Sequence, residues 1–406
     1  MIDSFFNTKM NSLKITIEKD PRVLITLLVF CEKNIIRYFV LVVSMIPIVG
    51  VVSEFIIPIA YICLFGFYFR KYGASISPIE LCVFFFTVLS LIFTCLFYPI
   101  NAKYISSNFW GTIFPCFKFF LIGLIIIPDR KTMDLLGKVS CVAILLETVF
   151  LFAYMIPRGL LQSDDMNRSY QLLPNQLFVL NYAFNSKHKT AWFFSVVGLV
   201  YCLSLGTRGP MIILLGFMYL KLLQTSSLKL RHKILYGALA ACLVVFFLST
   251  NLYVAVLKVI KSVFISLGFS TRIVDLAIIG NVTSYMSGRE ELFAIVLEKI
   301  AERPLIGYGV YGEWQWLGWN AHNMLLELLV HFGVIVGSSI FLWMLWVTLK
   351  SYIHTPNKQS KDLILIWFCY VFIKCLFGGT WLHFGVFFLI IFCLRENKRV
   401  NSGFYV

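Results

Sequence analysis

The chain carries little charge for its size. Asp, Glu, Lys and Arg make up only 14% of its 406 residues, while 59% are hydrophobic and the mean hydropathy is +0.84. A soluble protein cannot bury an apolar fraction of that size, whereas a lipid bilayer can solvate it. The composition therefore excludes an ordinary soluble enzyme and predicts an all-α polytopic membrane protein. No repeat or low-complexity tract divides the sequence, so we expect residues 1–406 to form a single integral membrane domain.

Several signatures of other protein classes are absent from the sequence. It contains no Walker A loop, Rossmann fingerprint, HExxH or GxSxG motif. The eleven cysteines lie in or beside apolar segments, so they indicate neither a disulfide framework nor a Cys-rich zinc site. Residues 1–20 lack the apolar core of a cleavable signal, and we expect them to remain as a cytoplasmic tail.

Apolar runs long enough to cross a bilayer predict about twelve transmembrane helices. The expected spans are residues 35–52, 55–69, 79–100, 109–127, 135–156, 170–185, 191–205, 210–223, 234–248, 323–349, 363–377 and 381–394.

Basic residues fall in alternate connections between these spans, as Arg70-Lys71, Arg130-Lys131 and Lys350 illustrate. The positive-inside rule then places both termini in the cytoplasm and one large loop, residues 249–322, on the outer face. The net charge of +15 thus reflects topology and contact with membrane lipids. These residues form no single basic face, so we expect no nucleic-acid partner.

Within the large loop, Ser287-Gly-Arg-Glu290 has the pattern of a capping box. Arg289 would then lie in the first turn of a helix, where free N–H groups favour anions, and its guanidinium could hold a diphosphate. The alternative is a structural salt bridge with a nearby glutamate such as Glu313. Arg208, in SLGTRGP, is a second candidate for a phosphate contact unless it only snorkels at the membrane boundary, and Arg272 is a third.

A Gly-rich stretch rich in aromatic residues follows the Arg289 helix. Exposed aromatic faces suit sugar rings, and they equally suit the headgroup belt of any membrane protein. These residues are Tyr308, Tyr311, Trp314, Trp316 and Trp319.

His322 and Asn323 stand at the predicted start of the next membrane helix. A helix N-terminus disfavours imidazolium, so His322 could be a neutral base, and Asn323 could orient it or a substrate. The alternative is a simple interfacial histidine. His331 lies deeper and out of phase with His322, so we interpret it as a core residue, and His383 is the spare candidate for a base. Asp164-Asp165 is expected to be a solvated pair, so we expect no metal and no cofactor.

The order of TRGP, GRxE, RPLIGYGVY and HNMLLELLVHFG resembles that of bacterial O-antigen and capsule repeat-unit polymerases (Wzy-type) and O-antigen ligases. One departure is that Gly333 and Gly337 are separated by one residue more than the family's G-x-x-G. The resemblance implies a GT-C-like fold and an active site on the outer face of the cytoplasmic (inner) membrane. It also implies an undecaprenyl-diphosphate-linked oligosaccharide as substrate and a chain-length regulator protein as partner.

By match to the family's motifs, Arg208 and Arg289 would bind the diphosphate and His322 would be the general base. Arg272, Asn323, Tyr308, Tyr311 and Trp316 would complete the substrate site. Two alternatives to a polymerase stay open: an O-antigen ligase that transfers the glycan to the lipid A core, and a lipid-linked oligosaccharide flippase or other transporter.

The predicted topology can be tested by cysteine labelling. A Ser284→Cys variant should react with a membrane-impermeant reagent in intact cells, because residue 284 lies in the predicted outer loop. A Gln359→Cys variant, in a predicted cytoplasmic loop, should react only after lysis, and the unsubstituted chain gives the background. Reaction of Ser284→Cys only after lysis would overturn the threading.

Overall fold

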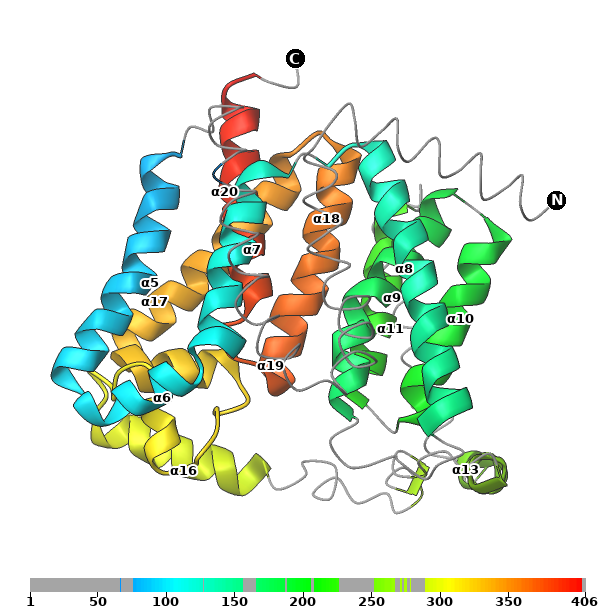
Figure 1. Ribbon diagram of the computed structural model, residues 1–406, viewed down its shortest axis with the longest axis horizontal. Coiled ribbons are helices and arrows are strands. Elements are labelled where there is room, and N and C mark those ends of the chain that lie inside the picture. Colours follow the sequence, from blue (N-terminus) through cyan, green and yellow to red (C-terminus); the bar gives the residue numbers. More distant parts are fainter. Residues whose placement is uncertain are drawn as a thin grey trace, which may run out of the picture. The chain divides into compact units, whose positions relative to one another are not determined.

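The structure is a computed structural model that describes residues 66, 76–126, 128–155, 166–186, 188–205, 208–225, 252–266, 271, 274–275, 278 and 289–403. In this part of the chain the secondary structure is helical and contains no strand (Figure 1). The chain divides into two units, one of residues 1–136 and 293–406 and the other of residues 137–292.

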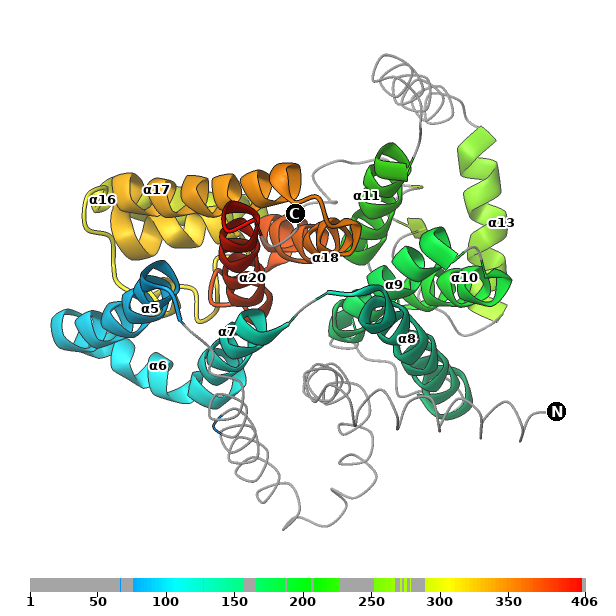
Figure 2. The same ribbon diagram turned by 90° about the horizontal axis from the view of Figure 1, so that it is seen from above.

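The first unit contains a set of long apolar helices and the short elements that connect them. Its helices are α5 (Pro78–Phe97), η2 (Pro99–Asn101), α6 (Ala102–Ser107), η3 (Phe109–Ile113), α7 (Phe114–Ile125), most of α16 (Arg289–Glu302), η7 (Gly312–Gln315), α17 (Met324–His354), α18 (Lys358–Phe368), η8 (Cys369–Ile373), α19 (Lys374–Gly378) and α20 (Phe384–Asn401). Figure 2 shows α20 beside α7. Gly123 permits this close approach, because a Cβ there would lie 3.1 Å from the Phe388 carbonyl oxygen.

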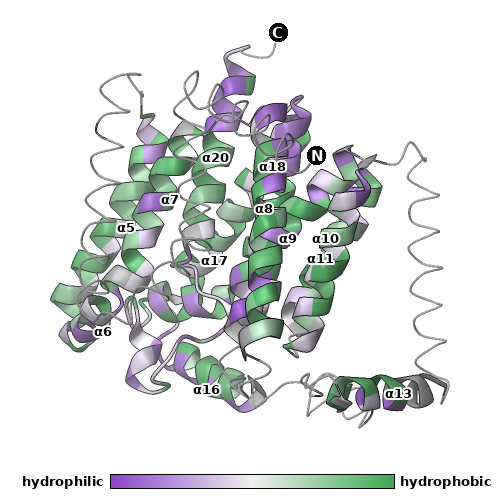
Figure 3. Ribbon diagram, turned by 45° about the vertical axis from the view of Figure 1, so that its right-hand side comes forward, coloured by the Kyte–Doolittle hydropathy of each residue, from purple (hydrophilic) through white to green (hydrophobic). Residues whose placement is uncertain are grey.

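In the described residues of the second unit there are four further apolar helices and the shorter α13. They are α8 (Arg130–Phe150, which begins in the first unit), with η4 (Leu151–Met155), α9 (Met166–Ser186), α10 (Lys189–Ser204), α11 (Arg208–Thr225) and α13 (Leu252–Ser266). Leu172, Val179 and Tyr201 form a buried core between α9 and α10 with Ile144 of α8. In Figure 3, α13 runs across the direction of α8 and α10 of the same unit.

Three of the helices described are long and apolar enough to cross a membrane: Pro78–Phe97, Arg130–Ala153 and Met324–His354. The all-α fold class and the membrane character predicted from composition are thus supported. The other predicted spans in the described residues also coincide with helices, but several of these are shorter. The spans predicted at 35–52 and 234–248, and all of 55–69 except Gly66, lie outside the described residues, so the count of about twelve remains a prediction.

Polarity in α5 is inverted relative to a soluble protein. Its exposed side chains include Phe85, Leu89 and Leu96, whereas Glu80 and Thr87 are buried. Glu80 both closes a capping box with Ser77 at the start of the helix and forms an ion pair with Arg395 of α20 at 2.9 Å. A row of exposed apolar side chains over a buried ion pair suits a hydrocarbon solvent, in which an unpaired charge is costly.

The apolar segment predicted as one span at 323–349 is broken at Gly333. This residue has φ 77° and ψ 171°, a backbone conformation that only glycine adopts readily, inside α17. A Cβ at Gly337 would lie 2.5 Å from the carbonyl oxygen of Leu328, so the two parts of α17 approach each other closely across the break. α17 is therefore two helical pieces, with residues 334–354 forming the longer one.

Residues 304–316, here called the docking segment, occupy the break in α17. The backbone N–H groups of Tyr308 and Gly309 donate to the carbonyl oxygens of Val330 and His331 at 2.7 and 3.1 Å. In return, the N–H of Val334 donates to the carbonyl of Pro304 at 2.6 Å. These bonds satisfy peptide groups that the break removes from the helical ladder, as non-helical backbone at membrane depth requires.

A Gly333→Ala substitution should lower the melting temperature of the purified chain strongly. Its Cβ would lie 2.3 Å from the Leu305 carbonyl oxygen, in addition to the strain of a positive φ. We expect a loss of at least about 3 kcal/mol. Gly318→Ala is the matched control: its φ is also positive but nothing lies within 4 Å of the added Cβ, so it should lose only about 1–2 kcal/mol. Equal losses in both variants would show that the contact with Leu305 is unimportant.

Candidate functional site

His322 and Asn323 stand directly before α17, where the sequence placed them. His322 is exposed and has a left-handed backbone conformation, with φ 54°. The side chain of Asn323 accepts hydrogen bonds from the N–H groups of Leu325 and Leu326 at 3.0 and 3.1 Å, so it is the N-cap of α17. The cap and the turn before it hold His322 at the end of the helix.

The tryptophans of this region differ in exposure. Trp319, near His322 in sequence, is 55% exposed, whereas Trp316 is half-buried and lies edge-on to Tyr308. Trp314 donates from Nε1 to Asn320 at 2.8 Å. Trp319 therefore presents an accessible aromatic face three residues before His322 in the sequence.

The expectation of exposed aromatic faces is wrong for Tyr308 and Tyr311, which are both buried. Tyr308 donates from its hydroxyl to Glu302 at 2.7 Å, and burial raises its pKa to about 12. Burial also raises the pKa of Tyr311, whose ring packs edge-on against Trp314. Tyr308 is thus held by Glu302 of α16 and Tyr311 packs within the docking segment, and a direct contact of either ring with substrate stays a prediction.

Glu302, which accepts the Tyr308 hydrogen bond, also forms an exposed ion pair with Lys299 at 2.6 Å. The Lys299 ammonium, followed by the Tyr308 hydroxyl, lowers the pKa of Glu302. Any support that Glu302 gives to the docking segment is therefore present at neutral pH and is lost as the pH falls through its lowered pKa.

Of the three predicted arginines, the structure describes the positions of Arg208 and Arg289. Arg289 is the first residue of α16 and Arg208 the first residue of α11, so both lie at helix N-termini, where the backbone favours anions. Both belong to the second unit, whereas His322 belongs to the first. Arg272, Ser287 and Asp164-Asp165 lie outside the described residues.

His383, the spare candidate for a base, is the N-cap of α20. Its Nδ1 accepts from the N–H of Gly385 at 3.1 Å, and its Nε2 lies 3.0 Å from Nζ of Lys374. A structural role thus accounts for its contacts.

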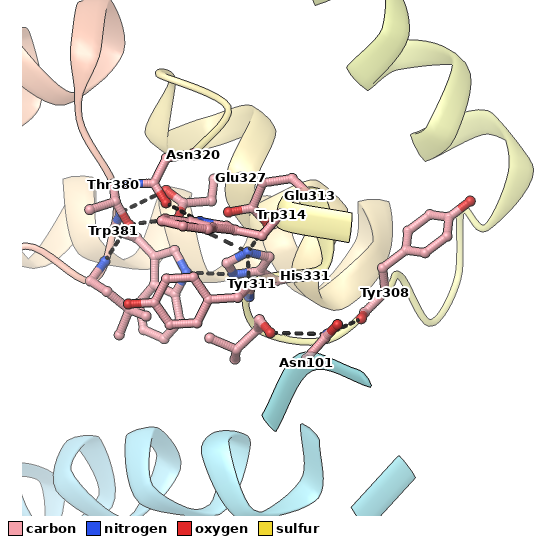
Figure 4. Close-up of polar contacts among 12 residues, drawn as sticks. Asn101, Tyr308, Tyr311, Glu313, Trp314, Asn320, Glu327, His331, Thr380 and Trp381 are labelled. Carbon is pink, nitrogen blue, oxygen red and sulfur yellow. Dashed lines mark hydrogen bonds and ion pairs between the residues drawn. The ribbon is translucent and has the colours of Figure 1, made fainter. Parts of the chain in front are cut away.

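His331 is buried, as expected of a core residue, but its neighbours are polar (Figure 4). Its Nε2 lies 2.6 Å from Oε2 of Glu313 and 4.0 Å from Oε1 of Glu327, and both carboxylates are fully buried. Glu313 comes from η7 in the docking segment, while Glu327 and His331 lie one turn apart in the short first piece of α17. We call these three residues the buried triad.

The link between α19 and α20 supplies hydrogen-bond donors to the triad. Oγ1 of Thr380 donates to Glu327 at 2.6 Å, and the backbone N–H of Trp381 donates to the same carboxylate at 3.1 Å. The indole Nε1 of Trp381 donates to Nδ1 of His331 at 2.8 Å. The triad therefore joins three parts of the first unit: the docking segment, α17 and this link.

The triad has the residue types of a divalent-metal site, and its ligand atoms lie within 4.8 Å of one another. The hydrogen bond from Trp381 opposes that function for His331. A neutral histidine that binds a metal through Nε2 carries its proton on Nδ1, where it meets the indole N–H, which can only donate. The donor set around His331 therefore does not fit a histidine-ligated ion.

No protein-family model matches the chain, and a comparison with curated proteins found no match.

The sequence contained a signal for the triad. Glu327 and His331 are ionisable residues separated by four positions within an apolar run, so they share one helix face, and intramembrane ionisable residues are functional candidates by default. The comparison of His331 with His322 alone, which lies on a different helix face, left the pairing of His331 with Glu327 unpredicted. Glu313 could not have been found this way, because it approaches the triad through the fold of the docking segment.

Asn101 anchors the docking segment from η2. Its Nδ2 donates to the carbonyl oxygens of Tyr308 and Val310 at 2.9 and 3.1 Å, and its Oδ1 accepts from Gln315 at 2.6 Å.

Asn101→Ala should therefore destabilise the docking segment by about 1–3 kcal/mol, because buried carbonyl groups lose their donors. Hydrogen exchange of residues 308–315 should accelerate. Asn108→Ala is the control, since its amide bonds only to Tyr104 and Ser107 nearby, and it should leave that exchange unchanged.

Proposed function

We propose that the chain is a polysaccharide polymerase of the O-antigen or capsule type. It transfers the glycan of an undecaprenyl-diphosphate-linked donor to a lipid-linked repeat-unit acceptor at the outer face of the bacterial inner membrane. The order of sequence motifs supports this function, together with the membrane character of the helices. About twelve spans and a GT-C-like arrangement belong to the same proposal.

The position of His322 is the observation that carries the proposal. An exposed imidazole stands at the N-terminus of the long apolar α17, and the exposed ring of Trp319 lies three residues before it in the sequence. The helix N-terminus favours the neutral imidazole, which can accept a proton. The exposed tryptophan face suits the packing of a sugar ring.

The proposed reaction is a single substitution at the anomeric carbon of the donor. The hydroxyl oxygen of the acceptor sugar bonds to that carbon, the bond from the carbon to the diphosphate oxygen breaks, and the hydroxyl proton passes to His322. The lipid diphosphate leaves with both electrons of the broken bond. Arg208 and Arg289 stabilise its charge, as positioned cations do for a departing phosphate group.

A transporter of lipid-linked oligosaccharides is the second candidate, and the buried triad favours it. Ionisable residues beside a broken membrane helix are typical of the substrate and ion sites of secondary transporters. The two functions differ in product, because transport moves the lipid-linked glycan across the bilayer without forming a glycosidic bond.

His322→Asn should abolish most of the transfer while the chain still binds the lipid-linked donor. Asparagine tolerates the left-handed backbone at this position but cannot act as a base. We expect a loss of about 10²–10⁴-fold in the rate at which purified protein in lipid vesicles lengthens lipid-linked repeat units.

His354→Asn, at the opposite end of α17, is the matched control and should retain full activity. Near-normal polymer from His322→Asn would refute the role of His322. Movement of labelled donor across the vesicle membrane by the unsubstituted chain, without new glycosidic bonds, would favour the transporter.

A further inference from the structure

The buried triad has an excess of negative charge when both of its carboxylates are ionised. Glu313 and Glu327 are both inaccessible to solvent, and their only ion-pair partner among the described residues is His331. No described lysine or arginine pairs with either carboxylate. Two ionised carboxylates beside a neutral imidazole would leave two uncompensated charges, and burial of unpaired charge is strongly unfavourable.

Hydrogen-bond donors determine which atom of His331 carries its proton. Trp381 donates to Nδ1 at 2.8 Å, and the backbone N–H of Tyr311 points at Nε2 from 3.2 Å. A neutral ring carries hydrogen on one nitrogen, so one ring N–H must face another N–H donor. The repulsion between the two donors is smaller at Nε2, where the facing N–H is farther away. The contacts of a neutral His331 therefore favour the tautomer with the proton on Nε2, from which it donates to Oε2 of Glu313 at 2.6 Å.

The same donors disfavour the imidazolium form. A second proton on the ring would lie on Nδ1, directly opposite the indole N–H of Trp381. Compensation of the charge by protonating His331 would thus replace a hydrogen bond by a repulsion between two donors.

One oxygen of the triad has no partner. Oε1 of Glu313 is buried without a hydrogen bond, although Oε2 of the same carboxylate is bound to His331. Both oxygens of Glu327 accept hydrogen bonds, from Thr380 and from the N–H of Trp381. Oε1 of Glu313 is consequently the open position at which a proton can be added without displacing an existing donor.

We propose that the buried triad is a proton-binding site, in which Glu313 and Glu327 share one bound proton while His331 remains neutral. The site lies at the break of α17 and goes beyond the proposed glycosyl transfer, which uses His322. With the proton bound, the docking segment can hold Glu313 against α17. Without it, the two carboxylates repel and the docking segment loses part of its attachment.

Other titratable groups surround the site but do not provide a cation. Tyr311 of the docking segment lies near both carboxylates and near Cys116 of α7, and Cys375 of α19 lies near Glu327. Lys374 neighbours Cys375 and contacts His383, and it forms no ion pair with Glu313 or Glu327.

Infrared spectroscopy of the full chain in lipid nanodiscs tests the proposal directly. At neutral pH the spectrum should contain a protonated-carboxyl band that disappears in Glu313→Gln and in Glu327→Gln. Glutamine at position 313 resembles the protonated carboxyl in shape, so this variant should stay folded. Glu302→Gln, which removes an exposed carboxylate, is the control and should leave the band unchanged.

Alkaline titration adds a second readout. Corrected for the base-catalysed intrinsic rate, the protection of residues 308–316 against hydrogen exchange should fall as the pH rises in the unsubstituted chain but not in Glu313→Gln. The proposal is overturned if neither glutamine variant loses a protonated-carboxyl signal. It is also overturned if the protein carries a stoichiometric divalent metal that Glu327→Gln abolishes. Because neither readout depends on sugar transfer, failure of the glycosyltransferase proposal would leave this result interpretable.

Discussion

The first unit depends on the backbone pairing between the docking segment and the break in α17. The break frees peptide groups that a bilayer cannot hydrogen-bond, and the docking segment supplies their partners. This pairing brings Glu313 to the face of α17 that carries Glu327 and His331. It also places Tyr308 and Tyr311 inside the fold, where they pack as structural residues. One glycine conformation therefore determines both the shape of α17 and the composition of the buried triad.

A second constraint is the inverted distribution of polarity. In α5 the polar residues Glu80 and Thr87 face inward while large apolar residues face outward. The hydrophobic effect, which usually sorts side chains, has no preference between a protein interior and lipid tails. Specific contacts such as Glu80–Arg395 and Gln176 to the Gly198 carbonyl therefore take a larger share in fixing which helix faces meet.

Composition and the length of apolar runs predicted the helical class and the position of most described helices, because both depend on local sequence. The capping role of Asn323 was within reach for the same reason, since an asparagine before an apolar run is a local signal. The break at Gly333 could not be predicted from the sequence, because a glycine in an apolar run is equally compatible with a straight helix. The burial of Tyr308 and Tyr311 and the approach of Glu313 to His331 arise from long-range pairing, about which hydropathy carries no information.

The broken helix has a consequence for how the chain enters the membrane. Met324–His354 is a continuous apolar run, and insertion machinery that reads hydrophobicity would receive it as one span. The hydrogen bonds that support the break come from residues 304–309, which must first pack against α17. We therefore expect two stages for this element: insertion as one nearly straight helix, followed by bending as the preceding segment packs against it. The information for the second stage resides in residues 304–316, a stretch too short to cross a membrane as a span of its own.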